Sequence, residues 1–304
     1  MKKLVICLLA IMLITSLAGC QLLDLIKPDE PIVYPKPEYT ASDDFISSAD
    51  ANDDAFAVSS VTKKENSPLE GKVIYWLGSS VTYGSGAEGE SMADYLAATT
   101  GAICRKEAVS GTTIFDDGGD GDSGAGSYTR RLVNSTVFDK NEKVDAFICQ
   151  ISTNDAATHR ITSWGALTDD NVTSKDEFDR STTIGGIEFI IAYVTETWGC
   201  PVYFYSGAEF TNQGPRLGTN PSSDNYGRLV DRVERAVEKW SNVEGVRVGV
   251  INMFEDADFN AAVSDSYYTW AMKDAVHPKR AAYLQWWTPY IENYLVINLT
   301  IKNK

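Results

Sequence analysis

The chain has 304 residues, a formal net charge of −15 at pH 7 and a sequence pI near 4.6. A balance this acidic argues against a nucleic-acid partner, because nucleic-acid phosphates require a basic protein face. The length permits one large domain or two small ones, and the charge suits a protein held outside the cell.

Residues 1–19 are predicted to be a targeting segment. A lysine pair precedes an apolar stretch over 4–17, which is too short for a comfortable membrane span. The following Leu17-Ala18-Gly19-Cys20 resembles a bacterial lipobox, which implies a lipoprotein signal peptide that is cleaved before Cys20, and lipidation of the Cys20 thiol. An ordinary signal peptide with an incidental cysteine is the alternative. We therefore expect an extracytoplasmic protein whose lipid anchors it to a bacterial membrane or cell surface.

Residues 20–68 are acidic, contain Pro, Ser and Asp, and show little apolar periodicity. This composition is typical of a flexible tether that lifts a domain off a membrane. A small extra subdomain is the alternative.

Three cysteines lie beyond these two segments: Cys104, Cys149 and Cys200. An odd number cannot pair completely within the chain. The sequence has no CxxC motif and no Cys/His cluster, so a structural zinc site is not expected.

Residues 69–304 are predicted to form one α/β domain. Apolar runs predict five strands, at 73–77, 102–109, 145–151, 202–205 and 246–251. Helical patterns lie between and after them, at 91–98, 187–198, 226–240 and 279–294. Strands that alternate with helices imply a parallel sheet covered on both faces, with sites at the carboxyl ends of the strands.

Two segments of this domain carry side chains suited to catalysis. Ser80 lies in the turn after the first strand, and His277 follows Asp274 by three residues, so that both side chains can lie on one side of a turn. The only other histidine is His159. A serine hydroxyl, a base and an orienting carboxylate are the parts of a nucleophilic hydrolase. A helix-capping serine and a plain surface turn are the alternatives.

Two further loops follow predicted strands. Ser110-Gly111-Thr112-Thr113 contains a glycine that permits close approach of a ligand to the backbone. Ser152-Thr153-Asn154-Asp155 offers a side-chain amide that can donate to an oxyanion. Taken alone, each loop is better explained as a turn or a helix cap.

In this order, the segments around Ser80, Gly111, Asn154 and His277 resemble the four blocks of the SGNH (GDSL-type) hydrolases, over about 71–294. The resemblance implies a three-layer, flavodoxin-like sandwich with a central five-stranded parallel sheet, hydrolysis of acyl esters and no cofactor or metal. It also implies that Ser80 is the nucleophile, His277 the general base and Asp274 its orienting carboxylate. The oxyanion hole would comprise the backbone N–H groups of Ser80 and Gly111 and the side chain of Asn154.

The sequence departs from the family pattern at two places. Ser79 replaces the usual aspartate, and we expect the turn to survive because serine also accepts a hydrogen bond. Ser152-Thr153 replaces the glycine that commonly precedes Asn-Asp, which would narrow the space beside the oxyanion.

The literal Gly-Asp-Ser-Gly at 121–124 is interpreted as unrelated to catalysis, because no buried strand and no histidine precede it. It lies in an Asp- and Gly-rich loop, 116–126, that does not match the spacing of an EF-hand. We interpret this loop as a flexible edge of the site, with cation binding as the alternative. His159 is interpreted as an exposed loop residue rather than part of the entrance.

Trp164 and Trp270 are predicted to lie on loops that border the site, where they either stack on sugar rings or pack the loops. The favoured function is a serine esterase that removes O-acetyl groups from carbohydrate, because an enzyme tethered at the cell surface meets glycans. A lipase or thioesterase on longer acyl chains, and a catalytically silent glycan-binding lipoprotein, are the alternatives. The partners expected are an acylated carbohydrate or other small ester, and a membrane through the lipid, but no nucleic acid.

Overall fold

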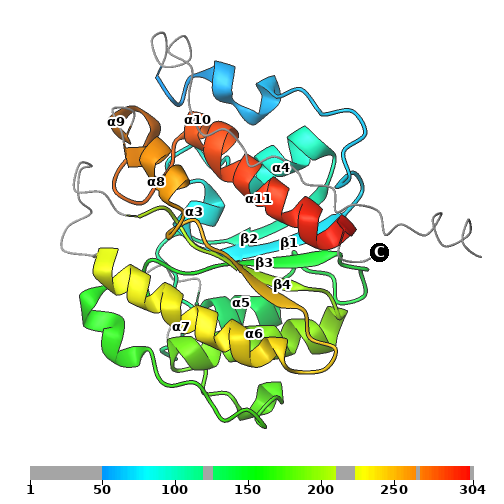
Figure 1. Ribbon diagram of the computed structural model, residues 1–304, viewed down its shortest axis with the longest axis vertical. Coiled ribbons are helices and arrows are strands. Elements are labelled where there is room, and N and C mark those ends of the chain that lie inside the picture. Colours follow the sequence, from blue (N-terminus) through cyan, green and yellow to red (C-terminus); the bar gives the residue numbers. More distant parts are fainter. Residues whose placement is uncertain (1–49, 119–125, 210–222, 265–267, 302–304) are drawn as a thin grey trace, which may run out of the picture. The chain divides into compact units, whose positions relative to one another are not determined.

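The apolar runs form a five-stranded parallel sheet in the computed structural model, which describes residues 50–118, 126–209, 223–264 and 268–301. The strand order is β2-β1-β3-β4-β5, with every neighbouring pair parallel (Figure 1). This is the flavodoxin-like order, and the predicted fold class is confirmed. The strands are β1 Val73–Gly78, β2 Ile103–Ala108, β3 Ala146–Gln150, β4 Val202–Tyr205 and β5 Val248–Ile251.

Helices cover both faces of the sheet and make the three layers (Figure 1). Helices α4 (Met92–Thr100) and α11 (Thr288–Val296) pack on one face. The other face is covered by α5 (Tyr128–Asn134), α6 (Thr183–Trp198) and α7 (Ser223–Ser241). Among the described residues, no helix is both long and apolar enough to cross a membrane.

Short helices and turns complete the described part. They are α3 Ser80–Tyr83, α8 Ala257–Ser264, α9 Tyr268–Ala271 and α10 Arg280–Ala282, with η1 Asp54–Phe56, η2 Val58–Ser60, η3 Thr158–Ser163, η4 Lys175–Glu177, η5 Tyr283–Trp287 and η6 Ile297–Ile301.

Burial of the strands follows their place in the sheet. The central strands β1 and β3 are buried over almost their whole length, as expected where helices cover both faces. Strand β2 lies at the edge and has no fully buried residue, with Ile103 and Arg105 exposed and the rest half-buried. Because β1 and β3 are neighbours, the loops that follow them emerge side by side at one edge of the sheet.

The segment 50–68, part of the predicted tether, packs against the rest of the domain, so the predicted boundary at 68 is wrong. Ala51 and Phe56 are buried in a small apolar cluster with Ala281, and Trp270 and Leu284 pack against it. Polar contacts rather than an apolar helix face hold most of this segment, which explains its weak periodicity. The remainder of the predicted tether, 20–49, and the signal segment with Cys20 lie outside the described residues.

Candidate active site

Ser80, His277 and Asp274 meet at the carboxyl edge of the sheet. Ser80 is the first residue of α3, directly after β1, and its Oγ lies 2.7 Å from His277 Nε2. The other ring nitrogen, Nδ1, lies 2.8 Å from both Asp274 carboxylate oxygens. The three residues that the sequence singled out therefore form one hydrogen-bonded chain, although 197 positions separate the serine from the histidine.

The environment of Asp274 keeps its carboxylate ionised. Burial raises the pKa of this carboxyl, but the His277 ring and the N–H groups of Val276 and His277 outweigh burial and hold the pKa below its usual range. Both N–H groups donate to Oδ1 at 2.9 Å. An ionised carboxylate only accepts hydrogen bonds, so the ring proton lies on Nδ1 and Nε2 presents its lone pair to Ser80.

The turn that carries Ser80 is held by Gln150, the last residue of β3. Its Oε1 accepts the N–H groups of Ser79 (3.0 Å) and Thr82 (3.2 Å) and the Thr82 hydroxyl (2.9 Å). The Ser79 side chain makes no capping hydrogen bond to the helix. The turn thus survives without an aspartate at position 79, but a residue 71 positions away supports it. The available signal is the single polar side chain of the otherwise apolar stretch 146–151.

Arg131, on α5, joins the loops after β1 and β2. Its buried guanidinium donates to the Gly78 carbonyl at 2.8 Å and to the Thr112 hydroxyl at 2.9 Å. It also lies 3.3 Å from Glu107 Oε1, which balances its charge. Arg131 is not among the residues predicted for the site, because no helix is predicted at 128–134.

Gly111 and Asn154 lie on the neighbouring loops of the same edge. Gly111 has a φ of +82°, a left-handed conformation that glycine adopts without strain. Asn154 Nδ2 donates to the Thr112 carbonyl at 2.9 Å, and the Ser152 hydroxyl donates to the same carbonyl at 3.3 Å. An amide nitrogen carries two hydrogens, so this bond orients the Asn154 side chain and uses one of them.

Asp155 holds the loop that follows β2 in place. It is fully buried, and its carboxylate accepts the Ile114 N–H at 2.9 Å and the Thr183 hydroxyl at 2.8 Å. Burial raises the pKa of this carboxyl, against the effect of these donors. Asp155 therefore connects the loop after β2 to the start of α6.

The two tryptophans are packing residues in the described structure. Trp164 is only 2% exposed, its Nε1 donates to the Asp155 carbonyl at 2.7 Å, and the guanidinium groups of Arg228 and Arg232 lie over its ring. Of the two alternatives predicted for Trp164, its covered ring favours packing of the loop over stacking on a sugar ring. Trp270 is half-buried and makes an edge-to-face contact with Phe56 at 5.8 Å.

His159 and the described ends of the loop 116–126, which are 116–118 and 126, lie outside the triad. His159 is exposed on η3, as interpreted from the sequence. Asp116 pairs with Arg130 at 2.7 Å. Residues 119–125, which include the Gly-Asp-Ser-Gly sequence, lie outside the described residues.

A small cavity is lined in part by residues that are next to the triad residues in the sequence, although no triad residue lines it. Its volume is about 10 Å³, and its lining includes Val81, which follows the serine, and Ala275 and Val276, which lie between the aspartate and the histidine. Met272 and Tyr205 also line it. A cavity of this volume holds about one water-sized group.

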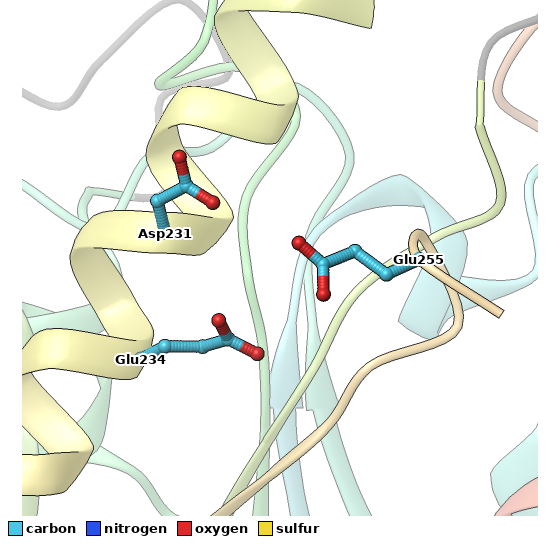
Figure 2. Close-up of side chains that lie close together, drawn as sticks. All are labelled: Asp231, Glu234 and Glu255. Carbon is cyan, nitrogen blue, oxygen red and sulfur yellow. The ribbon is translucent and has the colours of Figure 1, made fainter.

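One group of three carboxylates lies close together within the described ranges. Asp231 and Glu234 project from α7 toward Glu255, and their oxygens lie within 4.8 Å of one another (Figure 2). Burial and the two neighbouring charges raise the pKa of Glu255. Asp231 and Glu255 are exposed, and Glu234 already accepts a hydrogen bond from Asn252 at 2.8 Å. We assign no metal site to this group.

Solved structures share this architecture at low sequence identity. A protein from Lactobacillus plantarum is 18% identical with a TM-score of 0.54, over 76% of this chain and 99% of that chain. A carbohydrate acetylesterase family member from Sinorhizobium meliloti is 14% identical with a TM-score of 0.50, over 75% of this chain and 99% of that chain. No protein-family model matches the sequence, and no curated protein matches it. The fold implied by the resemblance to SGNH hydrolases is confirmed.

Proposed function

We propose that this chain is a serine hydrolase that cleaves carboxylic esters through an acyl-enzyme. The observation that carries the proposal is the 2.7 Å contact between His277 Nε2 and Ser80 Oγ, combined with the contacts of Asp274 behind the ring. A nucleophile, a base within hydrogen-bond reach and a third group that orients the base are the features that define such a site.

The reaction follows from the proton positions. Ser80 Oγ attacks the ester carbonyl while His277 Nε2 takes the hydroxyl proton, and Asp274 stabilises the resulting imidazolium. The imidazolium then gives its proton to the departing alcohol, which leaves an acyl group on Ser80. Water attacks this acyl group with His277 again as base, the imidazolium returns the proton to Ser80 Oγ as the acyl–Oγ bond breaks, and the carboxylic acid leaves.

The oxyanion formed in each step needs hydrogen-bond donors. We assign this role to the backbone N–H groups of Ser80 and Gly111 and to the Asn154 side-chain amide. The bonds from Asn154 and Arg131 to Thr112 support this assignment, since they hold the donor loops together before substrate arrives.

We propose a short acyl group on a carbohydrate as the substrate. We assign the acyl group to the cavity beside Val81 and Val276, whose volume of about 10 Å³ suits an acetyl methyl better than a long chain. The proposal that the acyl group is carried by a carbohydrate is supported by the similarity in fold to a carbohydrate acetylesterase family member. Stacking on Trp164 no longer supports it.

A panel of p-nitrophenyl esters from acetate to palmitate, together with acetylated polysaccharides, tests the proposal. We expect hydrolysis to be fastest for acetate, with acetate also released from polysaccharide, and to be lost in Ser80→Ala. A preference for long chains would instead indicate a lipase or thioesterase. No hydrolysis together with retained glycan binding would indicate a silent binding protein.

We also propose that Cys20 is the lipidated N-terminus of the mature protein, on the lipobox-like sequence that precedes it. Mass spectrometry of the membrane-extracted protein should find a lipid-modified chain that begins at Cys20. An unmodified chain that begins elsewhere, recovered in the soluble fraction, would contradict the anchor.

A further inference from the structure

The segment ahead of β1 contacts both loops that carry the triad. Asn52 Nδ2 donates to the Gly86 carbonyl at 2.9 Å, and Gly86 belongs to the loop that follows the Ser80 helix. The same side chain, through Oδ1, accepts the backbone N–H of Arg280 at 3.0 Å. Arg280 lies three residues after His277, so one amide side chain bridges the serine loop and the histidine loop.

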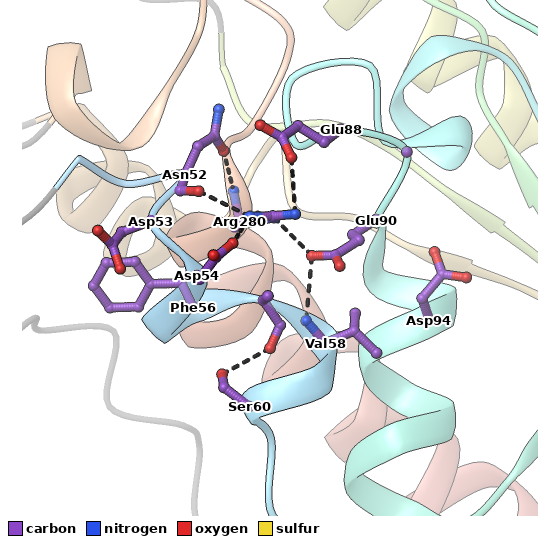
Figure 3. A network of polar contacts seen from close by, with 12 residues as sticks. Asn52, Asp53, Asp54, Phe56, Val58, Ser60, Glu88, Glu90, Asp94 and Arg280 are labelled. Atoms are coloured by element: carbon purple, nitrogen blue, oxygen red, sulfur yellow. Dashed lines mark hydrogen bonds and ion pairs between the residues drawn. The ribbon is translucent and has the colours of Figure 1, made fainter.

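The Arg280 side chain makes a second set of links between the same loops (Figure 3). Its guanidinium lies 2.9 Å from Glu88 and 2.8 Å from Glu90, both on the serine loop, and donates to the Asn52 carbonyl at 2.9 Å. The side chain is 9% exposed, whereas Glu88 is largely exposed. Glu90 also accepts the Val58 N–H at 3.2 Å, which ties the link back to the N-terminal segment.

The two loops are in close contact where these links hold them. A Cβ on Gly86 would lie 2.2 Å from the Pro278 carbonyl oxygen and 2.9 Å from that of His277. Lys273, on the histidine loop, donates from its Nζ to the Ser85 carbonyl of the serine loop at 3.2 Å. A shift of one loop relative to the other would therefore change the distance between Ser80 and His277.

We propose that Asn52 and Arg280 form a clamp that positions His277 against Ser80, so that the segment 50–60 is a functional part of the active site. Neither residue touches the reacting atoms, and both act through the geometry of the two loops. A displacement of about 1 Å between reacting groups can lower a rate about 100-fold, so the clamp can matter without contacting substrate. The kinetic test of this clamp rests on the proposed function, whereas the test by NMR of the His277 ring does not.

The variants Asn52→Ala and Arg280→Lys test the clamp. Arg280→Lys keeps the charge but loses the forked contacts. We expect each to lower kcat for a short ester by about 10- to 100-fold with KM within about twofold. Tyr75→Phe is the matched control. It removes the Tyr75 hydroxyl, which accepts the Asp139 N–H and donates to the Glu142 carboxylate. Both partners lie in the loop ahead of β3, at the edge of the sheet opposite the triad. The control should lower the melting temperature and leave kcat unchanged.

A readout that does not depend on activity uses the His277 ring. In a His159→Gln background His277 is the only histidine, so its Nδ1–H proton gives the only imidazole signal in the far-downfield NMR spectrum. We expect this signal to be sharp in the parent and in Tyr75→Phe, and to broaden through exchange in the clamp variants. If the clamp variants melt earlier but keep both the signal and kcat, the clamp is only structural and the proposal fails. If the parent hydrolyses no ester, the proposed function fails, and the signal alone decides the clamp.

Discussion

The Asp274→Asn substitution replaces one carboxylate oxygen by an NH₂ group, and the surrounding hydrogen bonds determine where that group lies. The Oδ1 position accepts two backbone N–H groups at 2.9 Å, so the amide oxygen must occupy it. The NH₂ group then takes the Oδ2 position, 2.8 Å from His277 Nδ1. Nδ1 lies equally close to Oδ1, but an N–H on Nδ1 would face the N–H groups of the amide, so the amide favours Nδ1 as an acceptor.

The consequence is the wrong tautomer of His277. With Nδ1 accepting, the ring proton moves to Nε2, which can no longer take the Ser80 proton. The equivalent change in a serine protease triad lowers kcat about 10⁴-fold. At about 1.36 kcal/mol for each factor of ten, this loss corresponds to an activation free energy that is higher by about 5.4 kcal/mol. We expect a loss of this order at neutral pH, measured as kcat and KM on p-nitrophenyl acetate.

Asp145→Asn is the matched control for this prediction. Asp145 also accepts a backbone N–H, from Val73 at 2.9 Å, but it lies at the amino edge of the sheet. The control should keep kcat within about twofold of wild type, because nothing in the triad depends on Asp145. An Asp274→Asn enzyme with kcat within about tenfold of wild type, far above the expected loss, would refute the assigned tautomer and the role of the carboxylate.

Three further predictions follow from the site. Asn154→Ala should lower kcat by about 10²–10³ with little change in KM, and a loss under about threefold would leave Asn154 as a turn residue only. Because the pKa of Asp274 is depressed, its ionised form stabilises the fold above an ordinary aspartate pKa of about 4, and this contribution is lost as the pH falls through the lower folded value. The difference in melting temperature between wild type and Asp274→Asn should therefore shrink below about pH 4, and a difference that grows there would contradict the depressed pKa. Trp164→Phe should lower the free energy of unfolding by about 1–3 kcal/mol, because it leaves the buried Asp155 carbonyl without its hydrogen-bond donor. The KM for acetylated polysaccharide should stay unchanged. A raised KM would show that Trp164 contacts the substrate after all.

The strands and the triad could be predicted because their signals are local. Each central strand is a short apolar run that helices bury on both faces of the sheet. The loops that carry Ser80 and Asn154 begin where two such runs, β1 and β3, end. Asp274 and His277 are three positions apart, so their contact follows from the turn. The partnership with Ser80 required the order of the four segments as well, because no local pattern links positions 80 and 277.

The supports of the site could not be predicted because they connect positions far apart in the sequence. Gln150 holds the Ser80 turn from 71 positions away, and Arg131 binds the Gly78 carbonyl from 53 positions away. Neither side chain belongs to a motif, and each contact depends on which strands are neighbours. The flavodoxin-like order places β3 beside β1, but it does not specify which side chains of β3 and α5 reach the serine turn.

The error at the N-terminus and the undecided role of Trp164 in the sequence have the same physical origin. Asn52 and its neighbours are held by polar contacts to Arg280, which leave no apolar period to detect. Trp164 is covered by Arg228 and Arg232, two cations that a composition-based view assigns to solvent. Charged side chains that cover a ring or bind a backbone carbonyl are not visible in hydrophobic patterning.

The central claim is that Ser80 is the nucleophile, and covalent trapping tests it most directly. The protein is treated with a p-nitrophenyl alkylphosphonate, and its peptides are analysed by mass spectrometry with Ser80→Ala and Ser85→Ala in parallel. Ser85 is the control because its hydroxyl, 2.6 Å from that of Ser110, lies on the same loop but outside the triad. We predict stoichiometric release of p-nitrophenolate and a single phosphonyl adduct on Ser80, retained in Ser85→Ala and absent from Ser80→Ala. An adduct on another residue, or full labelling of Ser80→Ala, would contradict the account.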